Sequence, residues 1–200
     1  ALVSIDAEIR RREQLLRQAG IADVDLLRRA RDEGRVEVDA CPSLVIVVDE
    51  LATLVADAPH VVDRLVDVAQ RGRTLGIHLV LATQRPSGVI SEAIRANTDI
   101  RVALRVADPH DSTDIVGAPE AADLDRDRPG QAYVRLGPGR VELGRFAHLA
   151  DDHLPTVVAG IAAAWEATGR PAPLSVWLQP LPASVALAAI ADSPPSDEST

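Results

Sequence analysis

The sequence predicts an α/β protein built on a parallel sheet, and three observations support this fold class. The first is an apolar run rich in Val, LVIVV at 44–48, in which apolar and polar residues do not alternate. The second is a similar run, IHLVL at 77–81. Strands covered on both faces have such compositions and are typical of parallel sheets. The third is the helical stretch between them, 51–75, which favours a right-handed crossover between parallel strands.

Periodicity and helix-breaking residues place the other elements. Apolar residues recur among charges over 5–20, where Gly20 ends a helix, and a charged helical stretch follows at 22–33. The helix at 51–75 is broken near the Ala-Pro-His at 58–60. The later elements are a short helix (88–98), a third strand (99–108), one or two helical turns (110–117), a hairpin around Gly-Pro-Gly (129–149) and a last helix (152–168). We expect the third strand to extend a doubly wound core, with His78 inside that core.

Composition limits the functions that the chain can have. The formal net charge of −9 excludes a basic footprint over the whole surface, although the 21 basic residues could still form a local stripe for nucleic acid. All of these basic residues are arginine, and a phosphate loop of the type G-x-x-x-x-G-K-[ST] requires a lysine. No apolar stretch reaches the length of a membrane-spanning helix. Since the chain also lacks methionine and starts at Ala1, we interpret it as a piece of a longer protein.

Polar side chains follow both apolar runs. Asp49 and Glu50 come directly after the first run, and Thr83, Gln84 and Arg85 follow the second. Because the carboxyl ends of neighbouring parallel strands open into one crevice, we expect these residues to converge. One acid there can hold Mg²⁺ through water, a second can polarise an attacking water, and a glutamine can position a terminal phosphate. The pattern indicates a nucleotide-hydrolysing site; a buried strand that simply ends in exposed charges is the alternative.

In combination, four segments resemble the FtsK/SpoIIIE ATPase family. SLVIVVDELATLV (43–55) is similar to the family's Walker B strand and following helix. AQRGRTLGIHLVLATQRPSGVISEAIRANTDIRVALRV (69–106) is similar to its next helix, sensor strand and following strand. AEIRRREQLLRQAG (7–20) resembles the helix after the Walker A region, and RPGQAYVRLG (128–137) resembles the closing hairpin. This resemblance covers about residues 5–150 and implies a RecA-like fold of the P-loop NTPase class, incomplete because the Walker A loop is missing.

The resemblance also implies a role for each polar residue at the strand ends. Asp49 would bind Mg²⁺ through water, and Glu50 would be the catalytic base. Gln84 would contact the γ-phosphate of ATP or the attacking water. Arg85 would pair with acids across the crevice or remain a surface charge at the strand end.

Paired arginines in the first helix match a further family feature. By resemblance, Arg11 or Arg12 would act as an arginine finger on the nucleotide of a neighbouring subunit, with a solvated helix face as the alternative. Arg71 and Arg73 are the second candidate pair.

The Pro-rich tail narrows the resemblance further. WLQPLPASVALAAI (177–190) resembles the segment that joins ATPase domains in the tandem type VII secretion ATPases of actinobacteria. Residues 1–169 would then be the C-terminal two-thirds of one ATPase domain, and 170–200 a linker to the adjacent ATPase domain, with Trp177 as its packing anchor.

The implied protein is an ATP-hydrolysing motor, membrane-associated and hexameric, at the cytoplasmic face of the bacterial membrane, where it exports protein substrates. The 200 residues alone would be inactive, since they contain no phosphate loop. Two alternatives stay open at this point. One is an ATP-dependent DNA translocase, and the other is a non-hydrolysing, ATPase-like docking module.

Overall fold

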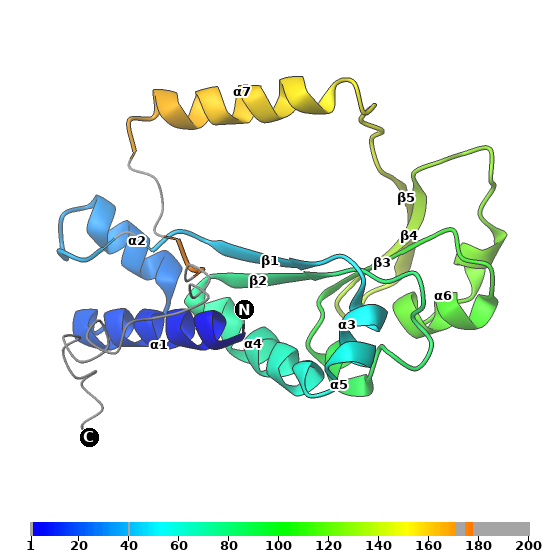
Figure 1. The fold of residues 1–200 in the computed structure, drawn as a ribbon, viewed down its shortest axis with the longest axis horizontal. Helices are drawn as coiled ribbons and strands as arrows, with labels where there is room; N and C mark the ends of the chain where they lie inside the picture. Colours follow the sequence, from blue (N-terminus) through cyan, green and yellow to red (C-terminus); the bar gives the residue numbers. More distant parts are fainter. Residues whose placement is uncertain (1, 40, 171–174, 178–200) are drawn as a thin grey trace, which may run out of the picture.

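Two short sheets form the framework of the chain, and helices pack against them (Figure 1). The computed structural model describes residues 2–39, 41–170 and 175–177. The helices are α1 (Leu2–Ala19), α2 (Val24–Asp32), α3 (Leu51–Asp57), α4 (Val61–Leu75), α5 (Glu92–Ala96), α6 (Pro109–Val116) and α7 (Leu154–Ala167), with a 3-10 turn at Glu120–Asp123. The strands are β1 (Leu44–Val48), β2 (Ile77–Leu81), β3 (Ile100–Leu104), β4 (Gln131–Leu136) and β5 (Val141–Arg145). Each helix and strand predicted from the sequence is present, with ends shifted by a few residues.

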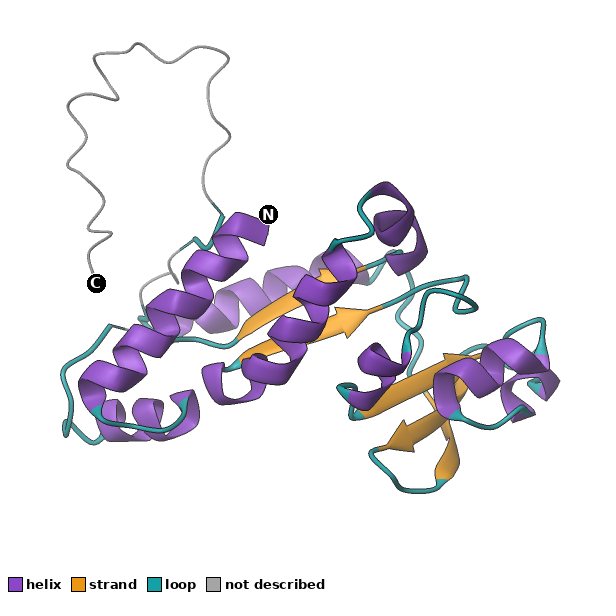
Figure 2. Ribbon diagram, turned by 90° about the horizontal axis from the view of Figure 1, so that it is seen from below, coloured by secondary structure: helices purple, strands orange, loops and turns teal. Residues whose placement is uncertain are grey.

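The first sheet is the predicted parallel pair. β1 and β2 run side by side with Leu44 opposite Ile77 and Val48 opposite Leu81. Helices α3 and α4 make the crossover, and Gly76 ends α4 in the left-handed conformation (φ 64°) so that β2 begins at once. Helices α1, α2 and α4 bury one face of this sheet, as Figure 2 shows from below. The fold class predicted from the sequence, α/β with a parallel sheet and flanking helices, is confirmed.

The third strand does not extend the parallel sheet. β3 pairs antiparallel with β4, and β4 pairs antiparallel with β5, in the order β3-β4-β5. β3 is covered on one face: Ala103 is buried against α6, whereas Ile100 and Leu104 are 63% and 54% exposed. Two arginines of this sheet hold the end of α6, since Arg101 donates to the Ile115 carbonyl (3.3 Å) and Arg135 to the Val116 carbonyl (2.9 Å). Cations at a helix C-terminus interact favourably with its dipole.

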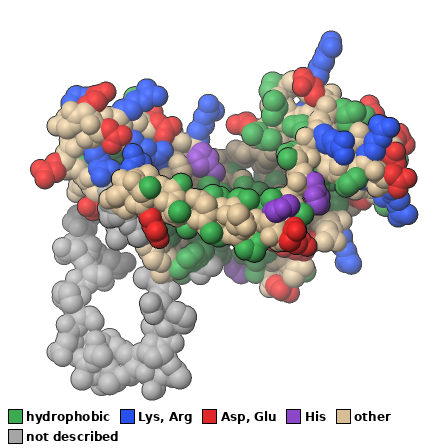
Figure 3. Space-filling view, turned by 90° about the horizontal axis from the view of Figure 1, so that it is seen from above, with side chains coloured by type: hydrophobic (Ala, Val, Ile, Leu, Met, Phe, Trp, Pro, Cys, Tyr) green, Lys and Arg blue, Asp and Glu red, His purple; other side chains and the backbone are tan. Residues whose placement is uncertain are grey.

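The opposite face of the first sheet is open among the described residues. Val45, Val47 and Val80 are 55%, 65% and 49% exposed, and His78 is exposed rather than in the core as expected. Cover on both faces was the sequence-based expectation, and only one face has it. Helix α7 lies apart from the sheets on this side in Figure 1, and none of its residues is buried. Figure 3 views the molecule from this side, where α7 runs across the front of the picture and apolar side chains are spread along it.

The Pro-rich tail falls mostly outside the described residues. The expected linker, 170–200, includes 171–174 and 178–200, which the structure does not describe. Trp177 is described, and its side chain is 54% exposed; its expected role as a packing anchor stays a prediction. No helix among the described residues has the length and apolar character needed to cross a membrane.

The close approach of α4 to β2 gives a first prediction. A Cβ atom on Gly72 would lie 2.5 Å from the backbone oxygen of Ile77. Gly72→Ala should therefore lower the free energy of unfolding by about 1–3 kcal/mol, because backbone must move to relieve the overlap. The measurement is urea unfolding of the 200-residue chain. Gly160→Ala in α7 is the matched control, since its Cβ meets nothing within 4 Å and alanine favours helix. Equal stability of the two variants would contradict this packing.

Candidate functional site

The ends of β1 and β2 place the predicted site residues next to each other. Asp49 and Glu50 leave β1 and lead into α3, while Thr83 and Gln84 leave β2. Two backbone hydrogen bonds hold these ends together: Ala82 N–H donates to the Val48 carbonyl at 2.8 Å, and Leu51 N–H donates to the Ala82 carbonyl at 2.8 Å. The expectation that the two strand ends meet is therefore confirmed by the parallel register and by these bonds.

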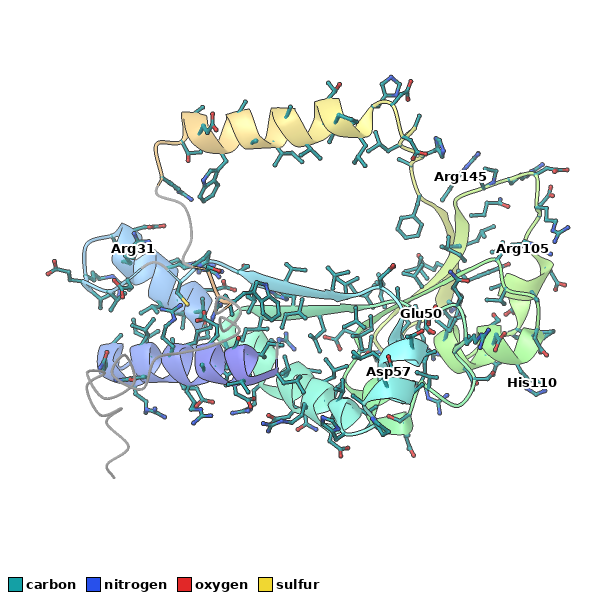
Figure 4. The ribbon with its side chains drawn as sticks, in the orientation of Figure 1. Arg31, Glu50, Asp57, Arg105, His110 and Arg145 are labelled. Atoms are coloured by element: carbon teal, nitrogen blue, oxygen red, sulfur yellow. The ribbon has the colours of Figure 1, made fainter. Side chains whose placement is uncertain are left out.

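Glu50 is the centre of this contact. Its side chain lies where β1 turns into α3, as labelled in Figure 4. Oε1 accepts hydrogen bonds from the Thr83 hydroxyl at 2.5 Å and from the Ala52 N–H at 3.2 Å. Oε2 accepts a hydrogen bond from the Gln84 N–H at 3.1 Å. The carboxylate is thus held from both strand ends and also acts as the N-cap of α3.

These donors set the charge of Glu50. The hydrogen bond from the Thr83 hydroxyl, together with that from the Gln84 N–H, lowers the pKa of Glu50 below its usual value. Partial desolvation works in the opposite direction, while the Ala52 N–H and the positive charge of Arg85 lower the pKa further. Glu50 is therefore an anion at neutral pH, in a fixed orientation, and able to accept hydrogen bonds.

The neighbouring side chains face solvent. Asp49, Gln84 and Arg85 are all exposed, and none of their side chains makes a hydrogen bond or ion pair within the described part of the chain. Two carboxylates side by side, one of them free, supply the hard oxygen atoms that Mg²⁺ prefers, usually through retained waters. The free amide of Gln84 and the guanidinium of Arg85 are donors suited to phosphate oxygens. The residues present therefore fit Mg²⁺ and the terminal phosphates of a nucleotide.

The two paired arginines of α1 lie in different environments. Arg12 is 2% exposed; it donates to Glu8 at 2.6 Å and to the Leu75 carbonyl at 2.7 Å, so it fastens α1 to the end of α4. Arg11 forms a two-bond pair with Glu8 at 2.7 and 2.8 Å and keeps 32% of its side chain exposed. Burial alone would raise the pKa of Glu8, but the two arginines outweigh it and lower that pKa. In this arrangement only Arg11 has surface with which to reach a neighbouring subunit.

The second candidate pair is divided by ion pairing and not by burial, since the Arg71 side chain is 41% exposed. Arg71 forms ion pairs with Glu13, at 3.1 Å, and with Asp67, so its guanidinium links α1 to α4. Arg73 is exposed and has no ion pair among the described residues. Of this pair, Arg73 is the residue whose charge is available to a partner.

Thr83 is the site residue that sequence reasoning did not assign. The sequence places it in the polar end of the second run without indicating a role for it. The signal was its position, directly after the strand that neighbours the two acids, because a hydroxyl there reaches a carboxylate across the strand pair. Pattern and spacing do not reveal which way a hydroxyl donates, and the structure does.

Comparisons with known proteins identify the class to which this site belongs. Residues 1–88 match the model of the FtsK/SpoIIIE family. This segment contains the first strand with its two acids and the second strand through Thr83, Gln84 and Arg85. These comparisons confirm the resemblance of this chain to the FtsK/SpoIIIE family.

Within that class, the chain is similar to type VII secretion ATPases. It is 40% identical over 141 residues to the type VII secretion system protein EssC of Staphylococcus aureus, an alignment that covers 70% of this chain and 9% of EssC. The cytoplasmic domain of the Thermomonospora curvata type VII secretion ATPase EccC matches with a TM-score of 0.75 and 28% identity, over 89% of this chain and 21% of that one. EccC (ATPases 2 and 3) of the same organism, in complex with a signal sequence peptide, matches with a TM-score of 0.70 and 28% identity. This match covers 91% of this chain and 33% of that one.

These matches confirm the RecA-like fold expected from the resemblance. This chain spans only 9% of the length of EssC, the curated relative that it matches. What those whole proteins do is therefore taken up below as a proposal.

The different burial of the paired arginines gives a second prediction. Arg12→Ala should lower the free energy of unfolding by about 2–4 kcal/mol, because it leaves the Leu75 carbonyl without its donor and half of the Glu8 pairing unmade. Arg11→Ala, the matched control one residue away, should cost less than about 1 kcal/mol, since its pair is partly exposed. Chemical denaturation of both variants measures the difference. An Arg12→Ala chain as stable as Arg11→Ala would show that Arg12 does not fasten α1 to α4.

Proposed function

We propose that this chain is part of an ATP-hydrolysing motor that drives type VII-like protein secretion, to which it contributes the Walker B strand and the sensor glutamine. One observation carries the proposal: two acids and a glutamine meet at the carboxyl ends of adjacent parallel strands, where Glu50 is held by Thr83 and Gln84. The 40% identity to a type VII secretion protein favours secretion over a DNA translocase, and the intact set of polar residues argues against a docking module without hydrolysis.

Each residue of the strand ends has a part in this proposal. Asp49 would hold Mg²⁺ through water, and such an ion would neutralise charge on the phosphates. Glu50, kept ionised, orients the attacking water and accepts its proton. Gln84 contacts the γ-phosphate or the water with its free amide, and Arg85 contributes positive charge beside them.

The cradle for the phosphates must come from other residues. The chain has no lysine, and a lysine is needed on the β- and γ-phosphates in a phosphate loop. We therefore infer that residues 1–169 supply part of one ATPase domain, that 170–200 link it to an adjacent ATPase domain, and that the 200 residues by themselves do not hydrolyse ATP.

The partners follow from the same proposal. The motor is a homo-oligomer, specifically a hexamer. In it, Arg11 acts as the arginine finger on the nucleotide of a neighbouring subunit, and Arg73 is the second candidate for this finger. The whole protein is associated with the cytoplasmic face of the bacterial membrane, and its substrates are secreted proteins. The complex of Thermomonospora curvata EccC with a signal sequence peptide supports a protein substrate for its relatives.

The third prediction tests the role of Glu50 in the full-length natural protein. Glu50→Gln keeps the shape of the side chain and removes the charge that activates water. ATP turnover should fall by about 10²–10⁴-fold, while the affinity for ATP stays close to that of the wild type. Turnover is followed by phosphate release, and affinity by equilibrium binding of a fluorescent ATP analogue.

Two controls complete this experiment. Glu142→Gln changes an exposed acid of β5, outside the site, and should leave turnover unchanged. The isolated 200-residue chain should show no magnesium-dependent turnover. A Glu50→Gln protein that hydrolyses ATP at the wild-type rate would reduce Glu50 to a helix cap, and turnover by the isolated chain would refute the need for a separate phosphate loop.

A further inference from the structure

The hydrogen bonds to the Glu50 carboxylate come from both strand ends. Three donors reach this carboxylate, and they are divided unequally between its two oxygens. Oε1 receives the Thr83 hydroxyl at 2.5 Å and the Ala52 N–H at 3.2 Å. Oε2 receives only the Gln84 N–H, at 3.1 Å. The two oxygens of Glu50 are therefore not equivalent.

The unequal division decides which oxygen can meet a water molecule. Each carboxylate oxygen has about two lone-pair directions. On Oε1 both directions are used, by Thr83 and by Ala52, whereas Oε2 keeps one direction free. Oε2 is thus the atom of Glu50 that can accept a hydrogen bond, and then a proton, from an attacking water.

Thr83 is itself held in place for this contact. The Arg85 N–H donates to the Thr83 hydroxyl oxygen at 3.1 Å, which fixes the direction of the hydroxyl. Its single proton has two acceptors within reach, Glu50 Oε1 at 2.5 Å and the Arg85 carbonyl at 3.3 Å. The hydroxyl donates to Glu50 Oε1, which is charged and nearer, because hydrogen bonds to an ionised acceptor are shorter and stronger.

The contact is not needed to keep the strand ends together. The bonds from Ala82 N–H to the Val48 carbonyl and from Leu51 N–H to the Ala82 carbonyl, both 2.8 Å, already do this. Of the three donors to Glu50, two are backbone groups fixed by the fold, and only Thr83 contributes a side chain. A role in orientation therefore accounts for the Thr83 hydroxyl better than a role in fastening.

We propose that Thr83 is a positioning residue for ATP hydrolysis, and that it turns the Glu50 carboxylate so that Oε2 faces the attacking water. This inference rests on the proposed function and extends it, because Thr83 acts through Glu50 and does not touch the nucleotide. In the reaction, the water gives its proton to Oε2 as its oxygen bonds to the γ-phosphorus and the bond to the β-phosphate oxygen breaks.

The first arm of the test needs no nucleotide. NMR spectra of the 200-residue chain report the backbone amide protons of Ala52 and Gln84, which are shifted by their bonds to the carboxylate. Thr83→Val keeps the shape of the side chain but removes the hydroxyl, so Glu50 can rotate and both amide signals should move. Thr83→Ser keeps the hydroxyl and should preserve the Ala52 signal, which decides the test because the Gln84 amide adjoins the substituted residue and shifts in every variant. Thr83→Ala serves as a second hydroxyl-free variant if the valine chain does not fold. An unchanged Ala52 signal in the hydroxyl-free variants would overturn the proposal.

The second arm measures ATP turnover in the full-length natural protein. Thr83→Val should lower kcat by about 10- to 100-fold with little change in KM, because the reacting groups are misplaced while ATP binding is untouched. Thr83→Ser should restore kcat. If Glu50→Gln is inactive and Thr83→Val has the wild-type kcat, the role of Thr83 is wrong and that of Glu50 stands. If Glu50→Gln itself is active, the proposed function fails, and the role of Thr83 fails with it.

Discussion

The hydrogen bonds between the Glu50 carboxylate and the end of β2 are the interaction on which the candidate site depends. Backbone hydrogen bonds keep the two strand ends together, and a hydroxyl and an amide from the end of β2 then fix the direction of the carboxylate that follows β1. Asp49 directly precedes Glu50, and Gln84 donates its own backbone N–H to Glu50. The same contact therefore places the side chains of Asp49 and Gln84. Parallel pairing makes the contact possible, because only parallel neighbours bring two carboxyl ends to one edge.

The arginines show how one residue type serves structure and function within a single chain. Arg12, Arg101 and Arg135 donate to backbone carbonyls at the ends of helices, where the dipole favours a cation. Arginine suits this use because it remains charged when buried and offers several donors in a fixed plane. Arg11 is paired with Glu8 but keeps part of its side chain exposed, and Arg73 is exposed without an ion pair among the described residues. Of the candidates for an arginine finger, Arg12 and Arg71 are thus engaged within the chain, whereas Arg11 and Arg73 present surface to a partner.

Much of the fold could be predicted from the sequence, because apolar runs, helical periodicity and glycine stops are local signals. The pairing of β3 could not be predicted from the sequence, because alternation shows that a strand is covered on one face but does not show which strand it pairs with. The strand ends were predicted as a site because two apolar runs each finish in polar residues. Arg11 and Arg12 could not be separated, as neighbours in sequence differ by about 100° around a helix and only packing decides which is buried. Thr83 was overlooked because the direction of a hydroxyl bond is a property of three dimensions.

The most direct test of this account is a structure of the full-length natural protein with Mg²⁺ and a non-hydrolysable ATP analogue. If Glu50 is the base, a water should lie in line with the γ-phosphate, within about 2.6–3.2 Å of Glu50 Oε2, with Oε1 still bonded to Thr83. Asp49 should lie in the hydration shell of the metal ion. A γ-phosphate bound away from the ends of β1 and β2, with Glu50 remote from it, would contradict the central claim that these strand ends form the hydrolytic site.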